Sequence, residues 1–419
     1  MIAPASRRLP DCVVSGSDVR SAVRDDAHVS RRIAISCLVL GGLVLAAGNA
    51  ALATTEPPTP APFGIPADRF DALDAAGLGW MFDGVEYPAQ PEGVAWPTDE
   101  WPVGDLPTGV DVDALQAAFD TAFAPRDGSG GVEAIVAVQG GRLVVEQYNN
   151  WEADEPHLSW SMAKSITQAM LGILVSEGRL DVFAPAPVPE WSEPDDPRHA
   201  ITTDDLLHMR SGLEWNEEYA GESDVIDMLY GDAKANRAHF AADRPLVADP
   251  GTLWYYSSGT TQILSRIVAD QVGYGDEGTA WAQQALFDPL GISSVRHDLD
   301  GTGIISGSSA IDMTSLDFAR FGLLYLRGGE WDGTEIVPTE WVDYARLPYP
   351  DAPEYGAQWW VMGSEDGNHG TLGANGFGGQ SITIVPELDL VVVVLANVQD
   401  ATADDASSAV IEAFSGVAS

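Results

Sequence analysis

Lysine is nearly absent from this chain of 419 residues. The 21 basic residues include only two lysines, Lys164 and Lys234, whereas the acidic residues number 63 and the formal net charge is −42. A surface of this sign repels nucleic-acid phosphates and anionic lipid headgroups, so we expect neither as a partner. Abundant acid with scarce lysine fits a protein kept soluble in high salt, or an ordinary acidic secreted protein biased toward arginine.

Cysteine is equally scarce, and both copies, Cys12 and Cys37, lie before residue 54. The seven histidines show neither an H-E-x-x-H motif nor another paired spacing typical of metal ligands. The chain also lacks a glycine loop of the kind that binds phosphate. We therefore predict no metal site and no cofactor.

The long apolar run of the N-terminal region predicts a leader. Arg31 and Arg32 precede the apolar residues 33–47, and the small-residue sequence 51–53 follows, as in a secretory signal with its cleavage site. Export and cleavage would place the mature chain outside the cytoplasm. The true start of translation would lie near Val29. The alternative is an uncleaved membrane anchor, the one contact with a membrane that we expect.

The remaining chain divides into a linker and one folded domain. Residues 54–62 form a Pro/Thr-rich linker, residues up to 109 lack periodicity and are expected to wrap a surface, and residues 110–419 form the domain. Within it, periodicity predicts terminal helices and two hairpins, at 111–124, 132–147, 381–395 and 401–414. The fold class is therefore α+β, with an antiparallel five-stranded sheet flanked by the terminal helices and a mainly helical insertion.

The chemistry begins at Ser161 and Lys164, within a predicted helix over residues 161–178. Residues three apart share one face of a helix, so the amine of Lys164 would lie beside the hydroxyl of Ser161. A serine becomes a nucleophile when a base removes its proton, and lysine can be that base if burial lowers its pKa. A surface lysine with a capping serine is the simpler alternative, but the neighbouring residues are apolar and favour burial.

A second element, residues 250–259, runs from a Pro-Gly turn through aromatic residues to Tyr256-Ser257-Ser258 and a helix from about Thr260. With the S-x-x-K element, it resembles the serine β-lactamase and penicillin-binding-protein superfamily, in particular class C-like esterases and 6-aminohexanoate-dimer hydrolases. The resemblance extends over roughly residues 110–415 through further short motifs, at 201–213, 288–291, 319–322 and Trp341.

The resemblance implies a β-lactamase/transpeptidase-like fold and a set of site residues. Ser161 would be the nucleophile, Lys164 its general base, and Tyr256 a phenol that relays protons and whose pKa must fall from about 10. The oxyanion hole would consist of the backbone N–H groups of Ser161 and Phe377. Ser258 stands where the family has asparagine and would contact Lys164 or the substrate.

The third family element, normally K-T-G or H-x-G, corresponds to Ala374-Asn375-Gly376. The resemblance implies that these three residues bind substrate. The cation that helps hold a substrate carboxylate in β-lactamases and carboxypeptidases is missing here. A substrate without that carboxylate is therefore favoured.

These observations together predict a serine hydrolase that cleaves a small ester or amide through an acyl-enzyme. The alternatives are a β-lactamase or D-alanyl-D-alanine carboxypeptidase, and a non-catalytic binding domain on the same fold. We interpret Asp195-Asp196 and Asp204-Asp205 as helix-start and surface charges. Most tryptophans are expected in the core, with Trp359 or Trp360 as candidates to line an acyl pocket.

Overall fold

The computed structural model has one large antiparallel sheet at the centre of its folded unit. The expected leader 1–53 and linker 54–62 lie outside the residues that the structure describes, which are 63–81, 85–126, 130–364 and 367–417. Within these ranges no helix combines the length and the apolar character needed to cross a membrane.

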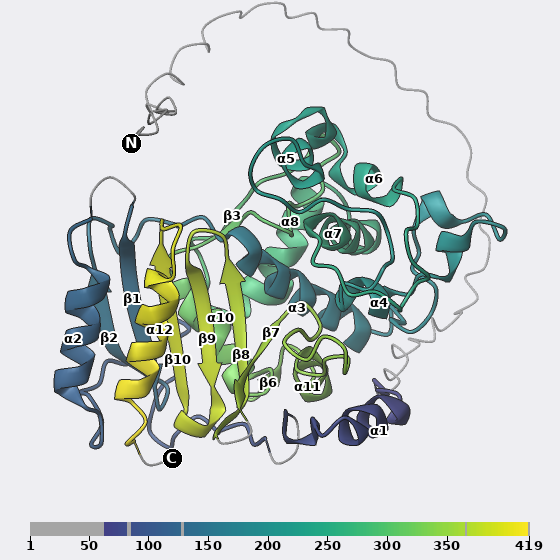
Figure 1. The fold of residues 1–419 in the computed structure, drawn as a ribbon. Helices are drawn as coiled ribbons and strands as arrows, with labels where there is room; N and C mark the ends of the chain where they lie inside the picture. The colour runs from purple at the N-terminus through teal and green to yellow at the C-terminus, as the bar shows by residue number, and fades with distance from the viewer. Residues whose placement is uncertain (1–62, 82–84, 127–129, 365–366, 418–419) are drawn as a thin grey trace, which may run out of the picture. The chain divides into compact units, whose positions relative to one another are not determined.

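The core of this unit is a six-stranded antiparallel sheet in the order β2-β1-β10-β9-β8-β7 (Figure 1). Its strands are β1 Val132–Gln139, β2 Arg142–Tyr148, β7 Trp360–Ser364, β8 Gly367–Gly376, β9 Gln380–Val385 and β10 Leu390–Ala396. The prediction of an antiparallel sheet is confirmed, but the expected count of five strands is wrong. The short strand β7 adds the sixth, and its sequence lacks the alternation of a half-buried strand.

The two faces of the sheet are covered by different helices. The terminal helices α2 (Val112–Ala122) and α12 (Thr402–Ala413) lie together on one face, where β1 and β10 contribute valines and isoleucine to a shared apolar cluster. On the other face lies a larger cluster that includes α3 (Ala163–Ser176) and α10 (Ser315–Leu326). Because β1 pairs with β10 residue by residue, the first and last thirds of the domain form one sheet.

The remaining described elements are further helices and two small two-stranded sheets. The helices are α1 Ala67–Ala75, α3 Ala163–Ser176, α4 Thr203–Leu207, α5 Asp224–Tyr230, α6 Arg237–Ala242, α7 Ser258–Val272, α8 Asp276–Ala282, α9 Asp288–Leu290, α10 Ser315–Leu326 and α11 Thr339–Ala345. The small strands are β3 Arg296–His297, β4 Ile311–Asp312, β5 Glu330–Trp331 and β6 Thr334–Glu335.

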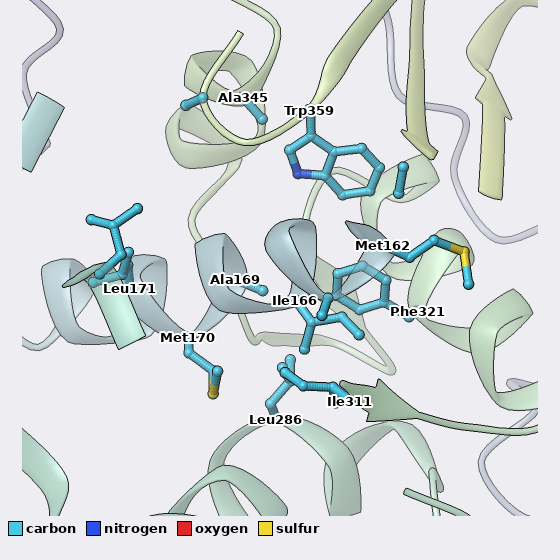
Figure 2. Packing of buried hydrophobic residues seen from close by; sticks show 14 of the residues in the cluster. Met162, Ile166, Ala169, Met170, Leu171, Leu286, Ile311, Phe321, Ala345 and Trp359 are labelled. Atoms are coloured by element: carbon cyan, nitrogen blue, oxygen red, sulfur yellow. The ribbon is translucent and has the colours of Figure 1, made fainter. Parts of the chain in front are cut away.

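Helix α3 is buried along nearly its whole length, from Ala163 to Val175. Figure 2 shows it passing between Trp359 on one side and Leu286 and Ile311 on the other. A helix that is apolar on all sides packs in the interior of a protein. This burial holds the N-terminal end of α3, which carries the site residues, in a fixed position.

Asp204 is a buried anchor rather than the surface charge expected from the sequence. Its carboxylate accepts hydrogen bonds from Arg69 of α1 at 2.7 Å and from the phenols of Tyr349 and Tyr344. Asp205 does form the expected helix start, as part of a capping box with Thr202. Arg69, Tyr344 and Tyr349 lie more than 130 positions away from Asp204 in the chain, so no local pattern could predict these three contacts.

Candidate active site

Ser161 lies in a single 3-10 turn, Trp160–Met162, that leads directly into α3. The turn is anchored by Ser159, whose backbone N–H donates to Asp312 of β4 at 2.9 Å. Trp160 adopts a φ of 44°, in the left-handed region that non-glycine residues rarely occupy. Backbone strain of this kind gathers at functional sites, where the surrounding structure enforces it. The predicted helix therefore begins slightly later than expected, at Ala163.

Lys164 contacts Ser161 as the spacing predicts. Its Nζ lies 3.1 Å from Ser161 Oγ, 2.9 Å from Ser258 Oγ and 2.9 Å from the backbone oxygen of Ser308. The side chain is only 1% exposed. Lys164 is thus a buried amine with three oxygen neighbours, one of them the hydroxyl of Ser161.

Burial also changes the proton affinity of Lys164. Loss of hydration lowers the pKa of the amine from 10.5 to about 8, and the negative charge of Glu217 opposes this shift. A neutral amine is therefore accessible in mildly alkaline solution. Such an amine can accept a proton from a neighbouring hydroxyl.

Tyr256 lies between the aromatic rings of Trp360, which stacks on it, and Tyr355, which meets it edge to face. Ser161 lies close enough to the phenol to influence its pKa. Burial raises the pKa of Tyr256 well above 10, an effect that Ser161 partly offsets and Glu217 reinforces. The expectation that this pKa falls from about 10 is therefore wrong. The Lys164 Nζ faces the Tyr256 ring at 4.9 Å from its centroid, and desolvation of the phenol dominates.

Glu217 and Tyr219 belong to the same cluster, although the sequence did not identify them. Glu217 accepts hydrogen bonds from Ser258 and from the phenol of Tyr219. Tyr219 and Ser161 also line the same cavity. The only local signal is an acidic, aromatic stretch that resembles an ordinary charged loop.

The end of β8 lies against the turn that carries Ser161. A methyl group added at Gly376 would meet the Ser159 carbonyl oxygen at 2.5 Å, so only glycine fits at this approach. The next residue, Phe377, packs its ring against those of Trp160 and Tyr219. Ser161 and Phe377, whose backbone N–H groups form the predicted oxyanion hole, therefore lie on adjoining segments of the chain.

The three predicted substrate-binding residues of β8 differ in exposure. Asn375 and Gly376 are half-buried. Ala374 is 1% exposed and belongs to the large apolar cluster, and none of the three is among the residues that line the cavity beside Ser161. The prediction that the Ala374 side chain contacts substrate is thus at odds with its position. Its inward direction follows from the alternation of side chains along a strand.

Ser161 opens into a cavity of about 170 Å³. The lining is mostly apolar and aromatic and comes largely from α5 and the loops before it, with Trp160, Ser161, Tyr219, Val225, Ile226, Leu229, Tyr230, Ser258, Ser309 and Phe377. Trp160 is partly buried against the large apolar cluster and also lines the cavity. The two tryptophans proposed to line an acyl pocket do not line this cavity. Trp359 is fully buried, and Trp360 packs on Tyr256.

We expect Gly376→Ala to separate the end of β8 from Ser161. The new methyl group would displace a backbone carbonyl, and misplacing reacting groups by ~1 Å can reduce a rate by about 10²-fold. Ester hydrolysis and the melting temperature of the variant test this expectation. Gly131→Ala is the matched control, because a methyl group there meets nothing within 4 Å. Equal activities of the two variants would refute a close approach at Gly376.

Among the described residues, no group of three or more histidine, cysteine, aspartate or glutamate side chains is arranged to hold a metal ion. The polar groups around Ser161 are hydroxyls, phenols, one amine and one carboxylate. This set favours proton transfer.

Comparisons with known proteins agree with this geometry. Residues 119–414 match the family model described as Beta-lactamase, and the chain belongs to this family of hydrolases. The 6-aminohexanoate-dimer hydrolase of Paenarthrobacter ureafaciens is 29% identical over 296 residues, covering 64% of this chain and 73% of that protein.

Solved structures share the fold at lower identity. A protein from Bacillus anthracis described as a candidate 6-aminohexanoate-dimer hydrolase has a TM-score of 0.60 and 21% identity, covering 85% of this chain and 96% of its own. A family VIII carboxylesterase has a TM-score of 0.55 and 14% identity, covering 72% and 97%. The predicted superfamily and its hydrolase branch are confirmed by the family match and these relatives.

Proposed function

We propose that this protein is a serine hydrolase that cleaves a neutral ester or amide through an acyl-enzyme on Ser161. One observation carries the proposal: a buried amine with a lowered pKa lies 3.1 Å from the Ser161 hydroxyl. General-base removal of a hydroxyl proton requires this proximity and a base that is neutral near the working pH.

In the proposed first half of the reaction, the neutral amine of Lys164 takes the proton of Ser161 Oγ. The oxygen then bonds to the carbonyl carbon of the substrate. The resulting oxyanion accepts hydrogen bonds from the backbone N–H groups of Ser161 and Phe377. When the bond to the leaving group breaks, that group takes a proton from the phenol of Tyr256, and Lys164 returns its proton to the phenol.

The second half reverses the proton path. Water gives a proton to the Tyr256 oxygen, whose own proton passes to Lys164, as the water oxygen attacks the acyl carbon. Ser161 takes the proton from Lys164 when the ester bond to the enzyme breaks. The raised pKa of Tyr256 supports this assignment, because it keeps the phenol protonated as a donor while Lys164 supplies the base.

The cavity supports an uncharged acyl group as the substrate. None of the residues that line it is lysine, arginine or histidine, and most are apolar or aromatic. A carboxylate placed there would be partly desolvated without a cation, which costs several kcal/mol. The same argument disfavours β-lactams and D-peptides, which carry a carboxylate near the scissile bond.

We expect kcat/KM for p-nitrophenyl butyrate to exceed that for benzylpenicillin or a cephalosporin by at least about tenfold. Tenfold corresponds to only about 1.4 kcal/mol, well below the cost of an unpaired carboxylate. Initial rates over a range of concentrations of each substrate test this expectation. Faster turnover of a cephalosporin would favour the β-lactamase alternative.

Fluorophosphonate labelling separates an enzyme from a non-catalytic domain on the same fold. The probe reacts with activated serines, so the native protein should be labelled and the heat-denatured protein should not. Absence of labelling, together with no hydrolysis of any ester, amide or lactam in a panel, would favour the binding domain.

A further inference from the structure

The carboxylate of Glu217 accepts hydrogen bonds from four donors close to Ser161 and Lys164. Its Oε1 accepts from Ser258 Oγ at 2.5 Å and from the Tyr219 phenol at 2.9 Å. Its Oε2 accepts from the Ser258 backbone N–H at 2.8 Å and from Trp215 Nε1 at 2.5 Å. The hydroxyl of Ser258 links this carboxylate to Lys164, since the same oxygen lies 2.9 Å from the Lys164 amine. The arrangement fixes the direction in which the Ser258 hydroxyl points.

A hydroxyl has one proton to donate and two lone pairs. Because Ser258 gives its proton to Glu217, it presents a lone pair to Lys164 Nζ at 2.9 Å. The second neighbour of the amine, the backbone oxygen of Ser308 at 2.9 Å, can only accept. Lys164 must therefore donate an N–H hydrogen bond to each of these two groups.

A neutral lysine amine has two N–H groups and one lone pair. If Ser258 and Ser308 take the two N–H groups, the lone pair is left for the remaining neighbour, Ser161 Oγ. We propose that Glu217 is a positioning residue that, by holding the Ser258 hydroxyl as an acceptor, aims the lone pair of Lys164 at Ser161. This inference rests on the proposed function and adds to it the residue that orients the base.

Replacing Glu217 by glutamine should reverse the direction of the hydrogen bond between the Ser258 hydroxyl and residue 217. Two N–H donors, from Ser258 and Trp215, converge on one carboxylate oxygen, so the amide oxygen of glutamine must occupy that position. The amide nitrogen then faces Ser258 Oγ and donates to it. Ser258 in turn points its own proton at Lys164 and competes with Ser161 for the lone pair.

The same substitution changes the charge around Lys164. The titratable groups that face the amine are Glu217 and the phenols of Tyr256 and, through Glu217, Tyr219, and both phenols are kept neutral by raised pKa values. The Glu217 charge raises the pKa of Lys164 against the lowering by burial. Its removal lowers that pKa, so the rise of kcat/KM with pH should move to lower pH.

The test is a pH profile of p-nitrophenyl butyrate hydrolysis by Glu217→Gln, with Glu218→Gln as the matched control of equal charge. We expect kcat of Glu217→Gln to fall by about 10²-fold on the plateau, with KM changed by less than about threefold and the acidic limb shifted to lower pH. The limb shift reports loss of the Glu217 charge beside Lys164, whereas the fall of kcat at nearly constant KM reports loss of the orientation of the base. The exposed Glu218 side chain makes no described contact with the cluster, so its variant should match the wild type.

A double-mutant cycle tests whether Glu217 acts through Ser258. In a Ser258→Ala background the hydroxyl is gone, so Glu217→Gln should cause no further loss of kcat. If Glu217→Gln alone does not fold, Ser258→Ala still tests the inference. That variant should lose kcat while its acidic limb stays in place, because the charge of Glu217 remains.

Two results would overturn the inference: a plateau kcat of Glu217→Gln within about threefold of the wild type, or an equal loss from Glu217→Gln with and without Ser258. Inactivity of Ser161→Ala alongside either result would leave the proposed hydrolase intact. Full activity of Ser161→Ala would instead refute the hydrolase itself.

Discussion

Ser161→Ala and Lys164→Ala should each lower kcat/KM for a neutral ester by at least about 10³-fold, and the double variant should be no slower than the slower single one. The nucleophile and its base act as a unit, since the hydroxyl needs the amine 3.1 Å away to lose its proton. Steady-state hydrolysis of p-nitrophenyl butyrate measures the loss, and circular dichroism shows whether each variant is folded.

The second lysine of the chain supplies the control for Lys164. Lys234 is half exposed and lies 3.9 Å from Asp298, so Lys234→Ala removes the same charge far from the proposed chemistry. Its activity should equal that of the wild type. If Ser161→Ala keeps more than a few per cent of the wild-type rate, the assigned nucleophile is wrong.

Tyr256→Phe should lower kcat by about 10²-fold or more while leaving the protein folded. The variant keeps the ring that stacks on Trp360 and meets Tyr355, and it loses only the proton that the leaving group needs. The loss should shrink for esters of more acidic alcohols or phenols, because a good leaving group needs less protonation. Rates across a series of leaving groups measure this trend.

The neighbouring Tyr255 is the matched control for Tyr256. Its side chain is 44% exposed, and its backbone N–H bonds to Met209, which Tyr255→Phe leaves in place. This variant should hydrolyse esters at the wild-type rate. An unchanged rate in Tyr256→Phe, or a large loss in Tyr255→Phe, would move the proton relay to another group.

The elements that the sequence predicted are those with local signals. The two hairpins and the terminal helices follow from periodicity and turn residues, and the i, i+3 spacing placed Lys164 beside Ser161. The start of α7 also follows locally, since Ser257 caps the helix by accepting from Thr260 at 3.0 Å. Short-range rules suffice wherever the partners lie within one element.

The features that the sequence missed depend on partners far apart in the chain. Glu217 meets Ser258 across 41 positions, and Asp204 meets Arg69 across 135. Whether an acidic side chain is a surface charge or a buried acceptor is decided by those distant donors. The direction of the Ala374 side chain likewise follows from the position of β8 in the sheet, which its three-residue motif does not specify.

The central claim is a covalent acyl-enzyme on Ser161, and peptide mass mapping tests it most directly. The protein is acid-quenched during turnover of p-nitrophenyl butyrate, digested and analysed, with a fluorophosphonate-labelled sample in parallel. We expect the butyryl group and the phosphonyl group on the same peptide and both on Ser161, with neither in Ser161→Ala. An adduct on any other residue, or labelling that persists in Ser161→Ala, would contradict the account.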